Sequence, residues 1–214
     1  IRSSMSRAMA KSIIPVSDIN NLPVQCQLTL RGREAPNESP LAGELILLYN
    51  TNNIVIFSSE LDLEILHDSE FCICDGTFEI VRVEFAQLYT IQGFCNGEAV
   101  PCCHALLPNK NRKSYNVLFT TVKNEILNRQ GNIGSLRTVV LDFEIAAHEA
   151  VRSVLAVQTR GCIFHFAQAL FRKVQSKGFL EAYQNIQAVQ AWIKLIKALA
   201  LLPPDLITMA WHQW

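Results

Sequence analysis

The chain has 214 residues, of which 50% are hydrophobic and 18% are charged. This length allows one sizeable hydrophobic core with a small appendage, and the composition excludes a disordered protein. Lysine plus arginine equals aspartate plus glutamate at 19 each, so the formal net charge is zero. Because the chain as a whole does not attract nucleic acid by charge, any such contact requires a local basic patch.

The seven cysteines are interpreted as free thiols. Most lie in strand-like apolar runs, at Cys72, Cys74, Cys95, Cys102 and Cys103. Buried thiols in a reducing compartment explain this pattern better than a disulfide framework does. The first residues lack the apolar core of a signal peptide, and no run approaches the ~18 apolar residues of a membrane span. We therefore expect an intracellular protein without a membrane segment.

Residues 1–68 are predicted to form an approach segment before the main domain. Prolines and asparagines make its first part irregular, with one short strand expected at 25–30. A β-hairpin follows at about 44–57, with an asparagine-rich turn between its two apolar strands. A short helix is expected from Glu60 to His67, with two serines in front of it that can cap it.

Residues 69–177 are predicted to form the main domain. Three strands joined by short connections come first and favour antiparallel neighbours. Alternating helices and strands follow. The expected elements are strands at 70–78, 83–92 and 98–107, a helix at 114–128, a strand at 136–141, a helix at 145–155, a strand at about 160–165 and a helix at 166–176. This order predicts an α/β fold: a ribonuclease-H-like mixed sheet, with three antiparallel strands, then α/β crossovers, and helices on its faces.

Two aspartates lie at the ends of apolar strands, Asp75 in the first strand of this domain and Asp142 after the fourth. In the expected sheet these two strands can lie side by side, at the edge where ligands of open α/β sheets bind. A carboxylate beside a buried strand costs desolvation energy unless a cation meets it, and carboxylates suit Mg²⁺ or Mn²⁺. The pair therefore predicts a shared divalent metal site and phosphoryl transfer on nucleic acid.

Each aspartate also has a purely structural explanation. Asp75 precedes Gly76, and Asp-Gly is a common turn pair, whereas Asp142 can be the N-cap of the helix that follows it. Glu144 is expected in the first turn of that helix, where it interacts favourably with the helix dipole. His148, one turn further on, is expected to be an exposed helix residue.

A Cys-x-x-His motif is formed by Cys162 and His165. It could contribute two ligands to a zinc site, for which Cys102, Cys103 and His104 are the nearby candidates. The preferred explanation is a buried thiol and a histidine that is hydrogen-bonded at the start of a helix. We therefore do not expect zinc. The basic side of the following amphipathic helix could face phosphates, or it could simply be solvated.

Five strings of this sequence, in their order and spacing, resemble the transposase domain of Mutator-like elements (MULE). They are Asp75-Gly-Thr-Phe78, Phe85–Ile91, Ala105–Lys110 with Tyr115 and Leu118-Phe119, Asp142-Phe-Glu144, and Gly161–Gln168 with Leu170, Arg172 and Lys173. The resemblance covers about residues 40–205.

The resemblance implies metal-dependent cleavage of transposon ends in DNA, followed by strand transfer through the 3′-hydroxyl, with Mg²⁺ or Mn²⁺ as cofactor. Asp75 and Asp142 match the first two residues of an Asp-Asp-Glu catalytic set, and both are expected metal ligands. Cys162 and His165 match a Cys-x-x-His signature near the active site. DNA as partner, a nuclear location and a capacity to form homo-oligomers are further implications.

The third acid of the catalytic set is not identified in this chain. The family's glutamate lies on a later helix beyond a helical insertion, and Glu181, the only glutamate after the signature, comes too early. Residues 178–214, with helices expected at 180–189 and 191–201, are interpreted as the start of that insertion. One alternative is a catalytically inactive, transposon-derived module that binds DNA or a protein. Another is a structural α/β domain whose aspartates are caps.

Overall fold

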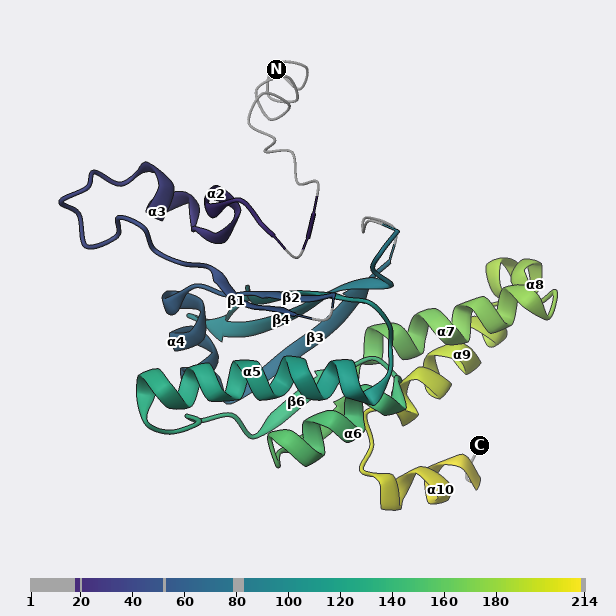
Figure 1. The fold of residues 1–214 in the computed structure, drawn as a ribbon. Helices are drawn as coiled ribbons and strands as arrows, with labels where there is room; N and C mark the ends of the chain where they lie inside the picture. Colours follow the sequence, from purple (N-terminus) through teal and green to yellow (C-terminus); the bar gives the residue numbers. More distant parts are fainter. Residues whose placement is uncertain (1–17, 20, 52, 79–82, 213–214) are drawn as a thin grey trace.

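The computed structural model describes residues 18–19, 21–51, 53–78 and 83–212. Residues 1–17 of the predicted approach segment lie outside these ranges. A sheet of seven strands, in the order β1-β2-β5-β4-β3-β6-β7, forms the centre of the described part (Figure 1). The strands are β1 Leu47–Thr51, β2 Ile54–Phe57, β3 Phe71–Thr77, β4 Gln87–Cys95, β5 Glu98–Leu107, β6 Thr138–Leu141 and β7 Gln158–Gly161.

The sheet is mixed and mostly antiparallel. All neighbours from β1 to β3 pair antiparallel, whereas β6 pairs parallel with β3, and β7 parallel with β6. The prediction of a mixed α/β sheet is therefore confirmed. The expected hairpin is also confirmed as β1 and β2, and it joins this same sheet through the pairing of β2 with β5.

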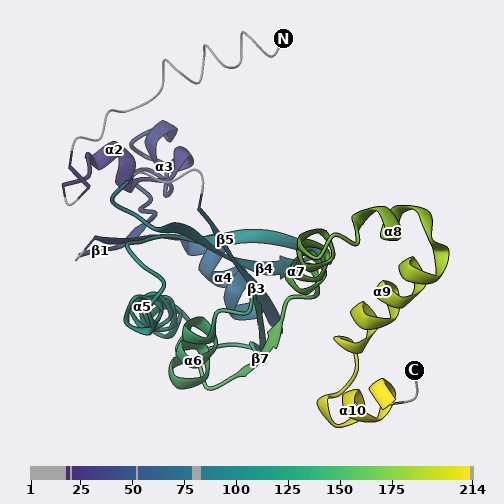
Figure 2. The same cartoon turned by 90° about the vertical axis from the view of Figure 1, so that its right-hand side faces the viewer.

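Helices cover the sheet unequally. The described helices are α2 Val24–Gln27, α3 Leu30–Glu34, α4 Glu60–Asp68, α5 Arg112–Gln130, α6 Ile145–Val154, α7 Ile163–Ser176, α8 Leu180–Asn185, α9 Gln187–Leu199 and α10 Pro204–His212. Figure 2 shows α5 and α6 on one side of the sheet, α2 and α3 on the other, and α8 to α10 extending away beyond α7. Within the described ranges, none of these helices has the length and apolar character needed to cross a membrane.

The main core lies between one face of the sheet and helices α4, α5 and α6. On α5 the buried residues recur at helical spacing and form a single apolar stripe. They are Tyr115, Leu118, Phe119, Val122 and Ile126. Cys72 and Cys74 of β3 and Val139 and Leu141 of β6 are buried on this face, because successive side chains of a strand point to opposite faces. The remaining residues of these strands point to the other face.

Cysteines contribute to this core as free thiols. Cys72, Cys74, Cys102 and Cys103 are buried, as expected, and burial raises the pKa of Cys102 to about 11. Cys95 is exposed, contrary to the expectation, because it is the last residue of β4, next to a turn. The four buried thiols therefore pack as small apolar side chains.

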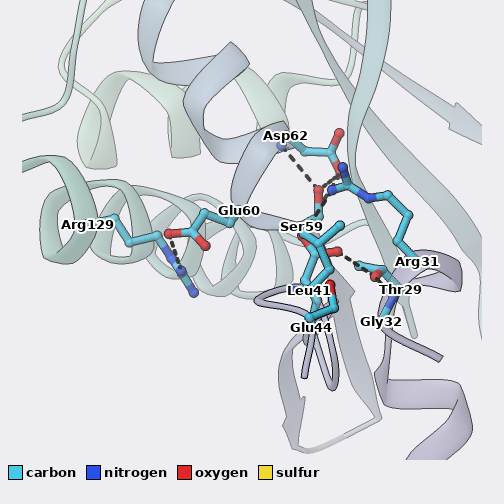
Figure 3. Close-up of polar contacts among 10 residues, drawn as sticks. Thr29, Arg31, Gly32, Leu41, Glu44, Ser59, Glu60, Asp62 and Arg129 are labelled. Atoms are coloured by element: carbon cyan, nitrogen blue, oxygen red, sulfur yellow. Dashed lines mark hydrogen bonds and ion pairs between the residues drawn. The ribbon is translucent and has the colours of Figure 1, made fainter. Parts of the chain in front are cut away.

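Helix α4 forms where it was predicted because its first turn is capped by side chains. The Ser59 hydroxyl accepts the Asp62 backbone N–H, and the Asp62 carboxylate accepts the Ser59 backbone N–H, which makes a capping box (Figure 3). Arg129 at the end of α5 pairs with Glu60 at 3.6 Å and links the two helices.

The strand predicted at 25–30 is wrong, because helices α2 and α3 occupy this region and only an isolated bridge joins Leu28 to Leu45. The Thr29 hydroxyl accepts the Gly32 backbone N–H at 2.8 Å and caps α3. It also donates to the Glu44 carboxylate at 2.6 Å (Figure 3). The cap at Thr29 thus favours a helix in this segment, although the alternation of apolar and polar residues at 25–30 had suggested a strand. Gly32 is required here, because an added Cβ would lie 2.6 Å from the Glu44 backbone nitrogen.

The strand predicted at about 160–165 ends earlier, at Gly161. Cys162 then forms the N-cap of α7, and His165 lies in the first helical turn. The Cys162 backbone N–H donates to the Leu141 carbonyl at 2.7 Å, so the chain is still tied to β6 where the helix begins.

Helices α8, α9 and α10 make their main contacts with one another and with α7. Two of them were predicted at 180–189 and 191–201, and the additional helix α10 begins at Pro204, a residue that is tolerated in a first turn. The division of the chain at residues 68 and 177 stays a prediction, as does the interpretation of 178–214 as part of an insertion.

Candidate functional site

Asp75 and Asp142 are brought together by the pairing of two parallel strands. In β3 and β6, Ile73 lies opposite Val140. Each aspartate comes two residues later, so this register, continued past the end of β6 at Leu141, would bring Asp75 opposite Asp142. The residues just before them are buried on the helix-covered face, so strand alternation directs both carboxylates to the other face. The prediction that the first and fourth strands of the domain are neighbours is confirmed (Figure 1).

The environment of Asp142 does not fully compensate its charge. Burial raises the pKa of the Asp142 carboxyl, and the nearby charge of Glu144 raises it further. The Glu144 backbone N–H, which donates to Asp142 Oδ1 at 3.1 Å, acts in the opposite direction, as do the ammonium group of Lys110 and, when it is protonated, the imidazole of His165. A carboxylate with a raised pKa is stabilised in its ionised form by an added cation.

His165 lies beside both aspartates. Its Nε2 is 3.4 Å from Asp75 Oδ1, and its positive charge, when it is protonated, favours the ionised form of Asp142. The imidazole reaches this position because Cys162 caps α7 directly after the sheet, which leaves His165 in the first turn. The Cys-x-x-His motif therefore brings a histidine to the aspartate pair.

The structural explanations of the two aspartates are only partly correct. Asp75 is not part of a turn, because Asp75 and Gly76 both pair with β4 inside the sheet. Asp142 does accept a backbone N–H at the start of α6, as a capping residue would, but the N-cap position belongs to Glu144. Capping alone leaves the position of Asp75 without an explanation.

Glu144 and His148 differ from what the sequence suggested. The Glu144 carboxylate does not cap α6; it accepts hydrogen bonds from Lys110 Nζ at 2.5 Å and from the Tyr115 hydroxyl. His148 is half-buried, and its Nε2 lies 2.8 Å from the backbone carbonyl oxygen of Asp142. Both residues thus support the segment around Asp142.

Lys110, Tyr115 and Gln87 were not singled out for any chemistry from the sequence. Gln87 Nε2 donates to the Tyr115 hydroxyl at 2.8 Å, and Tyr115 donates to Glu144, which binds Lys110. The one available signal was that all three residues lie in the strings that resemble the transposase family. Their contacts join β4, α5 and the loops after β5 and β6, so spacing in the sequence does not reveal them.

No third ligand joins the aspartates within the part of the chain that the structure describes. Among these residues, no three His, Cys, Asp or Glu side chains are grouped so that they could bind a metal ion. Cys102, Cys103 and His104, the candidates for zinc, lie on β5, and burial raises the pKa of the Cys102 thiol, which disfavours the thiolate that zinc binds. Binding of Mg²⁺ or Mn²⁺ to the aspartates stays a prediction. The expectation that zinc is not bound also stays a prediction.

The comparison with protein families covers the part of the chain that forms this site. Residues 71–169 match the MULE transposase domain. The MULE match runs from β3 into α7 and includes Asp75, Asp142, Cys162 and His165. The resemblance inferred from the sequence is thereby confirmed as a match of residues 71–169 to this family model. No curated protein matches the chain.

Proposed function

We propose that the chain contains the metal-binding part of a MULE-type transposase catalytic core that acts on DNA. In this proposal Asp75 and Asp142 are catalytic residues that together bind one Mg²⁺ or Mn²⁺ ion. The observation that supports it best is the parallel pairing of β3 with β6, whose register ends at Ile73 and Val140, two residues before each aspartate. The family match supports the proposal as well, because the matched residues 71–169 include both aspartates.

We also propose that the fold is ribonuclease-H-like. The strand order β5-β4-β3-β6-β7 supports this, because three antiparallel strands are followed by two parallel ones, as the sequence order predicted for such a sheet. Strands β1 and β2 extend the sheet on the β5 side. The helices α5 and α6 are the connections that lead into β6 and β7.

The residues of the site are suited to a hard divalent cation. Two carboxylates supply oxygen ligands, and the raised pKa of Asp142, caused by burial, is relieved by positive charge. Such an ion, when bound, would activate the attacking oxygen and neutralise charge on the phosphate. His165 keeps Asp75 oriented by its contact at 3.4 Å, and His148 fixes the backbone of Asp142.

Two acids bind one ion, whereas a two-metal reaction needs a further acid. Within the described residues no third acidic side chain joins the pair, and Glu181 lies on α8, which packs against α7 and α9. We therefore expect residues 1–214 not to cleave or join DNA in Mn²⁺. A nuclear location and a homo-oligomer belong to the same proposal.

DNA affinity measured with and without Mg²⁺ tests the proposal. We expect Mg²⁺ to strengthen binding of a labelled duplex by the wild type, and Asp75→Asn and Asp142→Asn to abolish this increment. Glu181→Gln, an exposed acid on α8, is the matched control and should behave as the wild type.

Equal DNA affinity with and without Mg²⁺ would contradict a metal-dependent DNA site and would favour the inactive DNA-binding module instead. Strand transfer by residues 1–214 in Mn²⁺ would show that a further acid completes the site within this chain. Absence of any DNA binding would favour a protein-binding or purely structural domain.

A further inference from the structure

We propose that Lys110 contacts a phosphate of the bound DNA, and that Glu144 and Tyr115 are positioning residues that place its ammonium group at the site. The inference rests on the proposed function, because it concerns the same edge of the sheet. It adds a substrate-binding cation to a site that otherwise consists of carboxylates and a histidine.

Two contacts fix the Lys110 side chain. Its Nζ lies 2.5 Å from Glu144 Oε1 and 3.7 Å from the centroid of the Phe78 ring. A lysine side chain is ordinarily flexible and loses entropy when it is ordered. Here it is already ordered, yet it remains 43% exposed, so its ammonium group can still donate to a ligand.

A chain of hydrogen bonds connects Lys110 to the buried core. Gln87 is fully buried and donates to the Tyr115 hydroxyl, which in turn donates to Glu144. Burial raises the pKa of Tyr115 well above its usual range, so its hydroxyl keeps the proton that Glu144 accepts. Surface ion pairs rarely have such support and contribute little on their own. A network that orders an exposed lysine through buried residues indicates a requirement for its position.

Lys110 is close to the aspartate pair without being bound to it. The shared neighbour is Glu144, whose backbone N–H donates to Asp142 and whose carboxylate binds Lys110. A phosphate that approaches Asp75 and Asp142 through a divalent ion would therefore meet a preorganised cation, which stabilises the charge that develops in phosphoryl transfer.

The salt dependence of DNA affinity tests this inference directly. In Mg²⁺, Lys110→Gln should lower the slope of log K against log salt by about 0.9, the value for one lost phosphate contact, and weaken binding several-fold. Lys194→Gln makes the same charge change on the exposed face of α9 and should leave the slope unchanged. Lys110→Arg keeps the charge and should retain most of the affinity.

A double-mutant cycle separates positioning from a merely structural role. Tyr115→Phe should weaken DNA binding in the wild-type background and have no further effect in the Lys110→Gln background. Melting temperatures of all variants show whether they are folded.

If Lys110→Gln binds DNA with the wild-type slope while Asp75→Asn and Asp142→Asn lose the Mg²⁺ increment, the inference is wrong and the proposed function stands. If Tyr115→Phe weakens binding equally in both backgrounds, its positioning role is wrong. If the wild type does not bind DNA, both proposals fail.

Discussion

Asp142 is a residue at which folding and the proposed metal binding make opposite demands. Burial raises its pKa, so the ionised carboxylate destabilises the folded chain at neutral pH. A group whose pKa is raised on folding contributes stability that is present below its unfolded pKa and is lost as the pH rises through its folded pKa. Such a residue is typical of functional sites, where charge is retained for binding.

Asp142→Asn should therefore raise the melting temperature at pH 7 in the absence of metal. The asparagine oxygen can still accept the Glu144 backbone N–H, so the local hydrogen bond is preserved. The gain should shrink as the pH is lowered toward 3.8, the ordinary value of an aspartate, because the wild-type carboxyl is then protonated as well. Thermal unfolding from pH 4 to pH 8 measures this, with the exposed Asp205→Asn as control. A lower melting temperature of Asp142→Asn at pH 7 would contradict it.

Single residues of the site differ in how well the sequence predicted them. Asp75 and Asp142 were recognisable because each follows an apolar run, and the neighbouring position of β3 and β6 agrees with the predicted strand order. Lys110, Glu144 and Tyr115 were not recognisable as a network, because it is formed by side chains from separate elements that meet only in the folded chain. Hydrogen bonds of this kind leave no periodic pattern in the sequence.

Among the helices and strands, those with strong periodicity and clear ends were predicted well. The strands β3 and β5 and the helix α5 agree within a few residues, because alternation or a 3.6-residue period coincided with turn and cap residues. The segments 25–30 and 160–165 were misassigned for one shared reason. In both, a helix begins directly after a residue in extended conformation, Thr29 or Cys162, and short apolar runs do not distinguish strand from helix.

The capping box of α4 explains why this short helix begins at Glu60, and it provides a test at the level of elements. Ser59→Ala should lower the free energy of unfolding by about 1 kcal/mol, because the Asp62 backbone N–H loses its acceptor in a buried position. Ser176→Ala at the end of α7, whose hydroxyl is exposed, should change it much less. Urea titrations measure both values. A Ser59→Ala variant as stable as the wild type would show that the cap contributes nothing.

Over the whole molecule, the sheet gathers the proposed site from distant parts of the chain. The aspartates come from β3 and the end of β6, Lys110 from the loop after β5, and His165 from α7. The fold class and the neighbouring position of β3 and β6 followed from the order of elements. How α8 to α10 are placed did not follow, because their apolar faces carry no information about which partner they pack against. Trp192 and Trp211 on these helices contact each other edge to face and remain about half exposed.

The most direct test of the central claim is Mn²⁺ binding by the whole chain, followed by electron paramagnetic resonance. If Asp75 and Asp142 share one ion, the wild type should bind one Mn²⁺ per chain, and Mg²⁺ should displace it. Asp75→Asn and Asp142→Asn should each abolish binding, whereas Glu181→Gln should not affect it. Binding of Mn²⁺ that is equal in the wild type and both aspartate variants, or no binding by the wild type, would contradict a metal site between β3 and β6.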